Sequence, residues 1–236
     1  MPLPSKRAAI ILAGGESSRF GSNKALQLLA GKPLICHVAE RLSQIADEIL
    51  VVIGYREPRA GYEVVLPSSV TIMNDGQEGK TPLIGIATGL QATKSEYAFI
   101  CACDLPFVKQ EVVELLYLRA SGADAAIPKW NQGHIEPLEA VYRTSSTLVA
   151  TRETLSLSGS PLKVMIGKLA KVVYVSVEGE VGMLDSDLRT FLNVNTREDM
   201  DRAEELYGRK HSPRRGGKSR DSGLDSGTRL SRVISR

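Results

Sequence analysis

Short apolar segments recur along the chain from residue 8 to about residue 207, and they alternate with longer amphipathic segments. The first one, residues 8–13, contains no polar side chain, which is typical of a strand buried on both faces of a parallel sheet. The pattern predicts further strands at residues 48–53, 70–73, 97–103, 123–128, 137–142 and 172–177, and an extended segment at 191–194. It predicts helices that begin near Pro33, at residues 82–92 and 109–120, and from Thr196. This alternation indicates an α/β fold with three layers and a mostly parallel sheet.

The composition of the chain changes at Gly208. Residues 1–207 have the balance of apolar and charged side chains of one globular domain with a substantial core. Residues 208–236 are rich in Ser, Gly and Arg and contain 9 Lys/Arg and 2 Asp/Glu, which predicts a basic, disordered tail. The preceding residues carry 21 basic and 25 acidic side chains. Because this body is slightly acidic, we do not expect it to bind nucleic acid, and only the tail leaves that function open.

No segment of the chain is typical of a membrane span or a secretory leader. Residues 8–13 are too few for the apolar core of a signal peptide, and no apolar stretch approaches the roughly 18 residues that span a bilayer. The chain has three cysteines, Cys36, Cys101 and Cys103. An odd number this small is not typical of a disulfide framework. We interpret them as small buried hydrophobic side chains rather than half of a metal site. The sequence therefore predicts a cytoplasmic protein.

The loop after the first strand is the most informative segment of the sequence. Gly14 and Gly15 follow the strand directly, and Arg19 and Lys24 come later in the same loop. Glycines let the backbone approach a ligand closely, and the two cations suit phosphate oxygens. The P-loop and the dinucleotide fingerprint are excluded, because neither spacing is present. A phosphate-binding loop at the end of a strand is the functional interpretation, and a Gly-rich turn with surface cations remains the alternative.

Asp104 follows another apolar run, at the end of a predicted central strand. Parallel strands end at one edge of a sheet, so its carboxylate is expected near the glycine loop. Mg²⁺ binds one or two carboxylates together with phosphate oxygens and water, which makes Asp104 the candidate metal ligand. The alternative, an N-cap for the helix near Lys109, is poor because five residues separate the two positions.

These segments together resemble the molybdenum cofactor guanylyltransferases. The resemblance covers residues 8–207 and rests on Leu-Ala-Gly-Gly at 12–15, Ser-Ser-Arg-Phe-Gly at 17–21, Lys-Ala-Leu at 24–26, Gly-Lys-Pro-Leu-Ile at 31–35 and Cys-Asp-Leu-Pro at 103–106. It implies a Rossmann-like nucleotidyltransferase fold and Mg²⁺-dependent transfer of GMP from GTP to the phosphate of molybdopterin or the molybdenum cofactor. It also implies molybdoenzymes or other cofactor-biosynthesis proteins as candidate partners.

The resemblance assigns roles to residues of the two motifs. It implies nucleotide binding by Leu12, Ala13, Gly14 and Gly15, the first three through their backbone. It implies catalytic roles for Lys24, Arg19 and Asp104. It also implies that Lys24 and Asp104 bind the nucleotide and that Asp104 binds the metal. The family usually has Asp before this lysine, whereas this chain has Asn23, which removes a negative neighbour.

Asp75 is a further candidate for nucleotide binding. The following Pro-Leu-Ile-Gly segment at 82–85 is similar to the family's Gly-Pro-Leu-Ala-Gly segment, but Thr81 replaces a glycine and Ile84 an alanine. The resemblance implies that Asp75 contacts the nucleotide, while Asn-Asp-Gly at 74–76 is equally typical of a plain turn.

The acceptor site is expected in the C-terminal part of the domain, where the pattern between residues 130 and 187 is weaker and indicates an antiparallel or acceptor-binding subregion. Asn-Val-Asn-Thr at 193–196 resembles a family motif that continues with proline, here Arg197. On a strand, Asn193 and Asn195 would face the same side and bind one ligand, the acceptor or the metal site. Lys163 stands where such enzymes carry a basic residue toward the pterin phosphate. Thr196 and Asp199 predict the N-cap of the last helix.

Two other functions remain open from the residues alone. The same loop occurs in cytidylyltransferases that act on pterin, isoprenoid-precursor or sugar phosphates, and backbone contacts do not distinguish guanine from cytosine. A noncatalytic nucleotide-binding protein that carries the cofactor is the alternative of another class.

Overall fold

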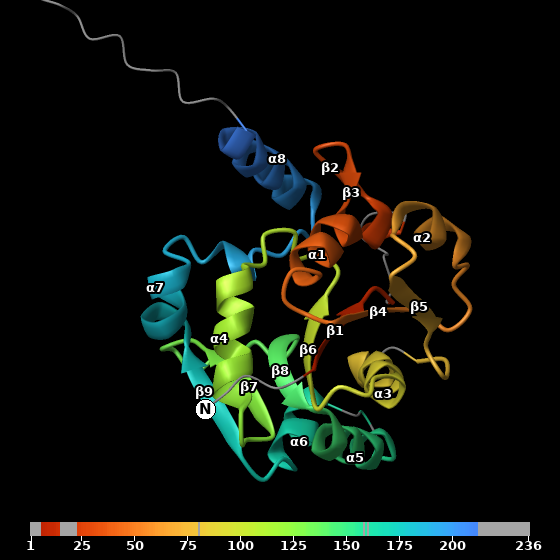
Figure 1. Ribbon diagram of the computed structural model, residues 1–236, viewed down its shortest axis with the longest axis vertical. Coiled ribbons are helices and arrows are strands. Elements are labelled where there is room, and N and C mark those ends of the chain that lie inside the picture. The colour runs from red at the N-terminus through yellow and green to blue at the C-terminus, as the bar shows by residue number, and fades with distance from the viewer. Residues whose placement is uncertain (1–5, 15–22, 80, 158, 160, 212–236) are drawn as a thin grey trace, which may run out of the picture.

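The computed structural model describes residues 6–14, 23–79, 81–157, 159 and 161–211, and Figure 1 shows the arrangement of its helices and strands. Gly15 and Arg19 of the glycine loop, and residues 212–236 of the predicted tail, lie outside the described residues. A seven-stranded sheet forms the centre of the fold, with the strands in the order β5-β4-β1-β6-β8-β7-β9. The strands are β1 (Arg7–Leu12), β4 (Glu48–Ile53), β5 (Val70–Asn74), β6 (Tyr97–Ala102), β7 (Ala125–Lys129), β8 (Glu139–Arg143) and β9 (Val172–Ser176).

The sheet is parallel except at β8. The pairs β1–β4, β1–β6, β4–β5 and β7–β9 are parallel, and β8 is antiparallel to both β6 and β7. The predicted mostly parallel sheet is therefore confirmed, and the antiparallel strand falls between residues 130 and 187, where the sequence indicated one.

Helices cover both faces of the sheet. They are α1 (Leu34–Leu42), α2 (Ala60–Val65), α3 (Pro82–Ala92), α4 (Gln110–Ala120), α5 (Thr144–Leu155), α6 (Leu162–Gly167), α7 (Gly182–Leu184) and α8 (Arg197–His211). Apolar residues of α1, α2 and α4 pack on one face, and those of α3, α5 and α6 pack on the other. Side chains of β1 alternate between these two cores, Ile11 on the first and Ile10 on the second. Burial on both faces explains why residues 8–12 of this strand are all apolar.

Several short elements complete the chain. A 3₁₀ turn, η1 (Lys24–Leu26), precedes a small hairpin of β2 (Leu28–Leu29) and β3 (Lys32–Pro33). A π turn, η2 (Val177–Val181), precedes α7, and a 3₁₀ turn, η3 (Arg189–Phe191), precedes α8. No helix in the described part of the chain has the length and apolar character to cross a membrane. Cys36, Cys101 and Cys103 are buried and unbridged, which confirms their interpretation as core residues.

The structure also contains α2, α6, α7 and the β2–β3 hairpin, which were not predicted, and it differs from the prediction in three further respects. Residues 191–194 are not a strand: η3 ends at Phe191, and the Val194 amide donates to the Asp104 carbonyl (3.0 Å) instead of extending the sheet. Helix α5 escaped prediction because three of its buried residues are threonines, Thr147, Thr151 and Thr154, so its buried face has no apolar pattern. Helix α8 continues to His211, beyond the predicted end of the folded domain at residue 207.

Candidate active site

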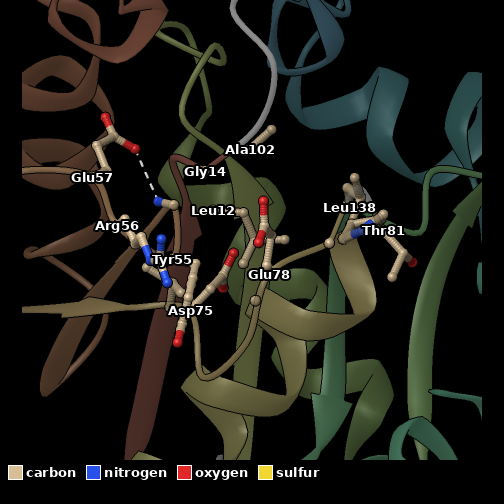
Figure 2. A pocket seen from close by; sticks show the side chains of 15 residues that line it. Leu12, Gly14, Tyr55, Arg56, Glu57, Asp75, Glu78, Thr81, Ala102 and Leu138 are labelled. Carbon is tan, nitrogen blue, oxygen red and sulfur yellow. Dashed lines mark hydrogen bonds between the residues drawn. The ribbon is translucent and has the colours of Figure 1, made fainter. Parts of the chain in front are cut away.

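The carboxyl ends of β1, β4, β5 and β6 meet at one edge of the sheet, beside the N-terminus of α3. A cavity of about 780 Å³ lies there (Figure 2). Ligands of open α/β sheets bind at this edge, because the loops that leave the strands diverge around a crevice. The cavity is lined by Leu12, Gly14, Val52, Gly54, Tyr55, Arg56, Glu57, Asp75, Glu78, Gly79, Thr81, Pro82, Gly85, Ala102 and Leu138.

The start of the glycine loop forms one wall of this cavity. The amides of Ala13 and Gly14 both donate to the Val52 carbonyl, at 2.8 and 3.1 Å. A Cβ atom at Gly14 would lie 3.0 Å from the Gly54 nitrogen and 3.3 Å from Asp75 Oδ2, so a larger residue would have to displace these neighbours by a few tenths of an ångström. Leu12 and Gly14 thus line the cavity, while the amides of Ala13 and Gly14 hold the loop to the sheet.

Lys24 lies at the start of η1 and reaches the end of β6. Its ammonium group forms an ion pair with Asp104 Oδ2 and donates to Asn195 Oδ1 at 2.6 Å. The Asp104 side chain is buried with the residue 8% exposed, and its Oδ1 has no hydrogen-bond partner among the residues described. The structure therefore brings together three residues that the sequence singled out from positions up to 171 apart.

Asp75 follows β5 and points into the cavity (Figure 2). Its amide donates to the Ile53 carbonyl (2.8 Å), while its Oδ1 is buried with no hydrogen-bond partner in the described part of the chain. Burial, and then the nearby charge of Glu57, raise the pKa of Asp75 to about 6. Thr81, where the family has glycine, caps α3 by accepting from the Leu83 amide at 3.3 Å.

Glu139 is a site residue that the sequence did not reveal. It begins β8 opposite Cys101 and is 4% exposed. Burial, and then the charges of Glu136 and Asp104, raise its pKa well above the usual range, while a hydrogen bond from Asn193 opposes the shift. Its Oε2, like Asp104 Oδ1, lacks a hydrogen-bond partner among the described residues. The signal in the sequence was an acidic residue directly before the short run of residues 140–142.

The two asparagines contact different groups. Asn193 bonds to Glu139, and Asn195 accepts from Lys24. Residues 193–195 are not a strand, so the expectation that the two asparagines share one face of a strand is wrong, while their binding to one ligand stays a prediction. The predicted cap of α8 is confirmed: the Asp199 amide donates to Thr196 Oγ1 (3.1 Å), and Asp199 Oδ2 accepts from the Thr196 amide (2.8 Å).

Lys163 lies on α6 beside a second cavity of about 480 Å³, together with Lys129 and Tyr174. This cavity shares no lining residue with the first. No group of three or more His, Cys, Asp or Glu side chains in the described ranges is arranged to hold a metal.

Comparison with known proteins identifies relatives along most of the chain. Residues 9–172 match the model of the MobA-like NTP transferase domain. A probable molybdenum cofactor guanylyltransferase of Methanosarcina acetivorans is 36% identical over 201 residues, which cover 83% of this chain and 88% of the relative. The molybdenum cofactor guanylyltransferase of Desulfosudis oleivorans is 35% identical over 83% of this chain and 93% of its own length.

Solved structures agree with these relatives. The molybdopterin-guanine dinucleotide biosynthesis protein A of Archaeoglobus fulgidus is 30% identical, with a TM-score of 0.71, and the match covers 86% of this chain and 99% of that one. The 4-diphosphocytidyl-2C-methyl-D-erythritol synthase of Anaerococcus prevotii has a TM-score of 0.63 at 14% identity, over 86% and 96% of the two chains, and shares the fold alone.

Proposed function

Because the chain belongs to the MobA-like NTP transferase family, we propose that it transfers GMP from GTP to the phosphate of molybdopterin or the molybdenum cofactor. The products are a guanine dinucleotide cofactor and pyrophosphate. One observation carries the proposal: Lys24 and Asp104 meet at the edge of the sheet where the glycine loop and the larger cavity lie.

The reaction requires positioning and charge rather than a strong base. An oxygen of the acceptor phosphate forms a bond to the α-phosphorus of GTP, and the bond from that phosphorus to the bridging oxygen breaks as pyrophosphate leaves. A phosphate is already a nucleophile at neutral pH, so its alignment and the neutralisation of the triphosphate lower the barrier. Lys24 supplies one positive charge at this place, and we assign the same role to Arg19.

Mg²⁺ is the proposed cofactor, with Asp104 as its ligand and Glu139 as the neighbouring carboxylate. The residues fit such an ion, because Asp104 Oδ1 and Glu139 Oε2 are buried acceptors without hydrogen-bond partners in the described chain, and unpaired buried acceptors are costly. Carboxylate oxygens are the ligands that Mg²⁺ prefers, usually only one or two of them. When bound, the ion neutralises charge on the phosphates during transfer.

Asp75 is the proposed nucleotide-binding carboxylate of the larger cavity. Its Oδ1 is a buried acceptor without a partner among the described residues, so a ligand with donors would satisfy it. The adjacent N1–H and N2–H₂ groups of guanine present two donors to one carboxylate, whereas cytosine has an acceptor beside its amino group. This difference favours GTP over CTP at this cavity.

For the acceptor we propose contacts from Asn195, which adjoins Lys24, and from Asn193, which adjoins Glu139. Lys163, beside the second cavity together with Lys129, is the proposed contact for a part of the acceptor other than the reacting phosphate. The backbone of Leu12, Ala13, Gly14 and Gly15 is assigned to the nucleotide side.

A turnover assay with GTP, Mg²⁺ and molybdopterin tests the function. Asp104→Asn keeps the size of the side chain but removes the charge, and we expect it to lower kcat by a factor of about 100 or more. The melting temperature should change little by comparison. Wild-type protein that binds GTP but releases no pyrophosphate would favour the noncatalytic carrier instead. A preference for CTP over GTP would overturn the guanylyl assignment.

A further inference from the structure

The Glu57 carboxylate lies next to the turn that begins with Lys24, and the proposed reaction gives it no role. Its Oε1 accepts from Asn23 Nδ2 and from the Tyr62 hydroxyl (2.7 Å), and its Oε2 accepts from the Gly54 amide (2.9 Å). Tyr62 is fully buried, and burial followed by its bond to Glu57 raises the pKa of the phenol. Glu57 therefore has three donors at fixed positions, which hold its carboxylate in one orientation.

Asn23 uses both ends of its side-chain amide. Its Oδ1 accepts from the Ala25 amide (3.0 Å), which caps the 3₁₀ turn η1. Its Nδ2 donates to Glu57 Oε1 and to the Tyr62 hydroxyl (2.9 Å). Because Lys24 is the first residue of this turn, the orientation of Asn23 sets the direction in which the lysine side chain leaves it.

The same carboxylate also holds the wall of the larger cavity. Gly54, bonded to Glu57 Oε2, lines that cavity and lies against Gly14, where an added Cβ would approach its nitrogen to 3.0 Å. Asn74 Nδ2 donates to the carbonyls of Gly54 and Glu57, at 2.9 and 2.8 Å, and fixes this loop to β5. Glu57 thus connects the cavity wall to the turn of Lys24 through a continuous series of hydrogen bonds.

The side chain at position 23 has two partners, the Ala25 amide, which donates, and Glu57, which accepts. Asparagine satisfies both of them. An aspartate would still accept from the Ala25 amide, but it would place a second carboxylate against Glu57 and would have no donor for it. Like charges in hydrogen-bonding range are strongly unfavourable when partly buried, and the side chain would turn away. The Asn23 that replaces the expected acid is therefore matched to Glu57.

We propose that Glu57 is a positioning residue that acts through Asn23 to direct Lys24 toward Asp104 and the polyphosphate, an inference that rests on the proposed function. Asp104 and Asn195 hold the ammonium group at the end of the Lys24 side chain. Glu57 positions the backbone end of that side chain through Asn23 and the turn.

A double-mutant cycle tests this pairing. Asn23→Asp should lower GTP affinity and kcat/KM for GTP by about tenfold or more, because it sets two carboxylates against each other. Adding Glu57→Gln should restore both quantities to within about threefold of wild type, since the glutamine amide donates to the new aspartate. Glu63→Gln, which changes an exposed carboxylate of α2, is the matched control and should have no effect. A double variant no better than Asn23→Asp alone would overturn the proposal.

A second measurement separates positioning from general stability. In a Lys24→Ala background, Asn23→Asp should change the dissociation constant of GTP by less than about twofold, because the residue through which it acts is gone. An undiminished loss in that background, or an equal loss of melting temperature in every variant, would show a merely structural role. Dissociation constants are measured without acceptor. Wild-type protein that binds GTP without turnover would therefore contradict the proposed function. The dissociation constants of the variants would still test the pairing of Asn23 with Glu57.

Discussion

The Lys24–Asp104 pair explains how a charged site is kept in a buried position before substrate arrives. A carboxylate that is 8% exposed loses most of its hydration, and the adjacent ammonium group compensates for that loss. The pairing engages Asp104 Oδ2 and leaves Oδ1 without a hydrogen-bond partner among the described residues. A triphosphate offers Lys24 alternative oxygens, so the ion pair is suited to exchange partners when the nucleotide of the proposed reaction binds.

Asp75 makes the stability of the protein depend on pH. Its pKa rises from the usual 3.8 to about 6 in the folded chain, so the folded protein binds more protons than the unfolded chain between these values. Stability contributed by this group is therefore greatest at low pH and falls as the pH rises through that window. We expect Asp75→Asn to raise the melting temperature relative to wild type at pH 7.5, and to do so less at pH 4.5. Parallel melting curves for the two proteins would contradict this.

At the scale of elements, the site depends on strand ends and helix starts. Helix α3 begins at Pro82 directly beside the cavity, with Thr81 as its N-cap. The threonine hydroxyl satisfies an amide of the first turn that would otherwise lack a partner within the helix. The substitution of the family's glycine by Thr81 therefore strengthens the helix that forms this wall.

Removing the cap should destabilise the domain measurably. We expect Thr81→Ala to lower the free energy of unfolding by about 1 kcal/mol, because the Leu83 amide loses its acceptor. Thr81→Ser keeps the hydroxyl and should stay close to wild type. Urea denaturation followed by circular dichroism measures both, and equal losses in the two variants would exclude the capping bond as the cause.

At the scale of the whole molecule, α8 joins the domain through a third, smaller core. Val194 and Ala203 pack with Leu29, Leu34 and Phe107. The Ala30 amide donates to Glu204 (2.7 Å), and the rings of His37 and Tyr207 lie 5.1 Å apart. The helix thus covers the hairpin that follows the Lys24 turn, and the folded unit includes it.

Two truncations should therefore behave differently. Removing residues 212–236 should leave the melting temperature and kcat unchanged, because the described core ends with α8. Removing residues 197–236 takes away α8 and should lower the melting temperature by several degrees, since Ala203 and its neighbours lose their burial. If removing residues 212–236 abolished turnover, the basic tail would have a part in catalysis.

The local pattern of the sequence was sufficient for the strands and for the two main motifs. Strands β1, β4 and β6 are continuous apolar runs, and parallel pairing places their ends together, so Asp104 could be expected near the glycine loop. Helix α5 could not be found in the same way, because threonines that bury their methyl groups look polar in a sequence. The segment at 191–194 was misjudged because its partner is the loop after β6 rather than a neighbouring strand.

Contacts between distant residues were decided by the tertiary structure alone. Glu57 lies 34 positions from Asn23, and Glu139 lies opposite Cys101 at the end of β6 only because β8 runs antiparallel beside β6. Periodicity reports which face of an element is buried, but a hydrogen bond between two loops leaves no period in either of them. The sequence by itself therefore determined the sheet and the chemistry at its edge, while the partner of each carboxylate follows from how the chain folds back on itself.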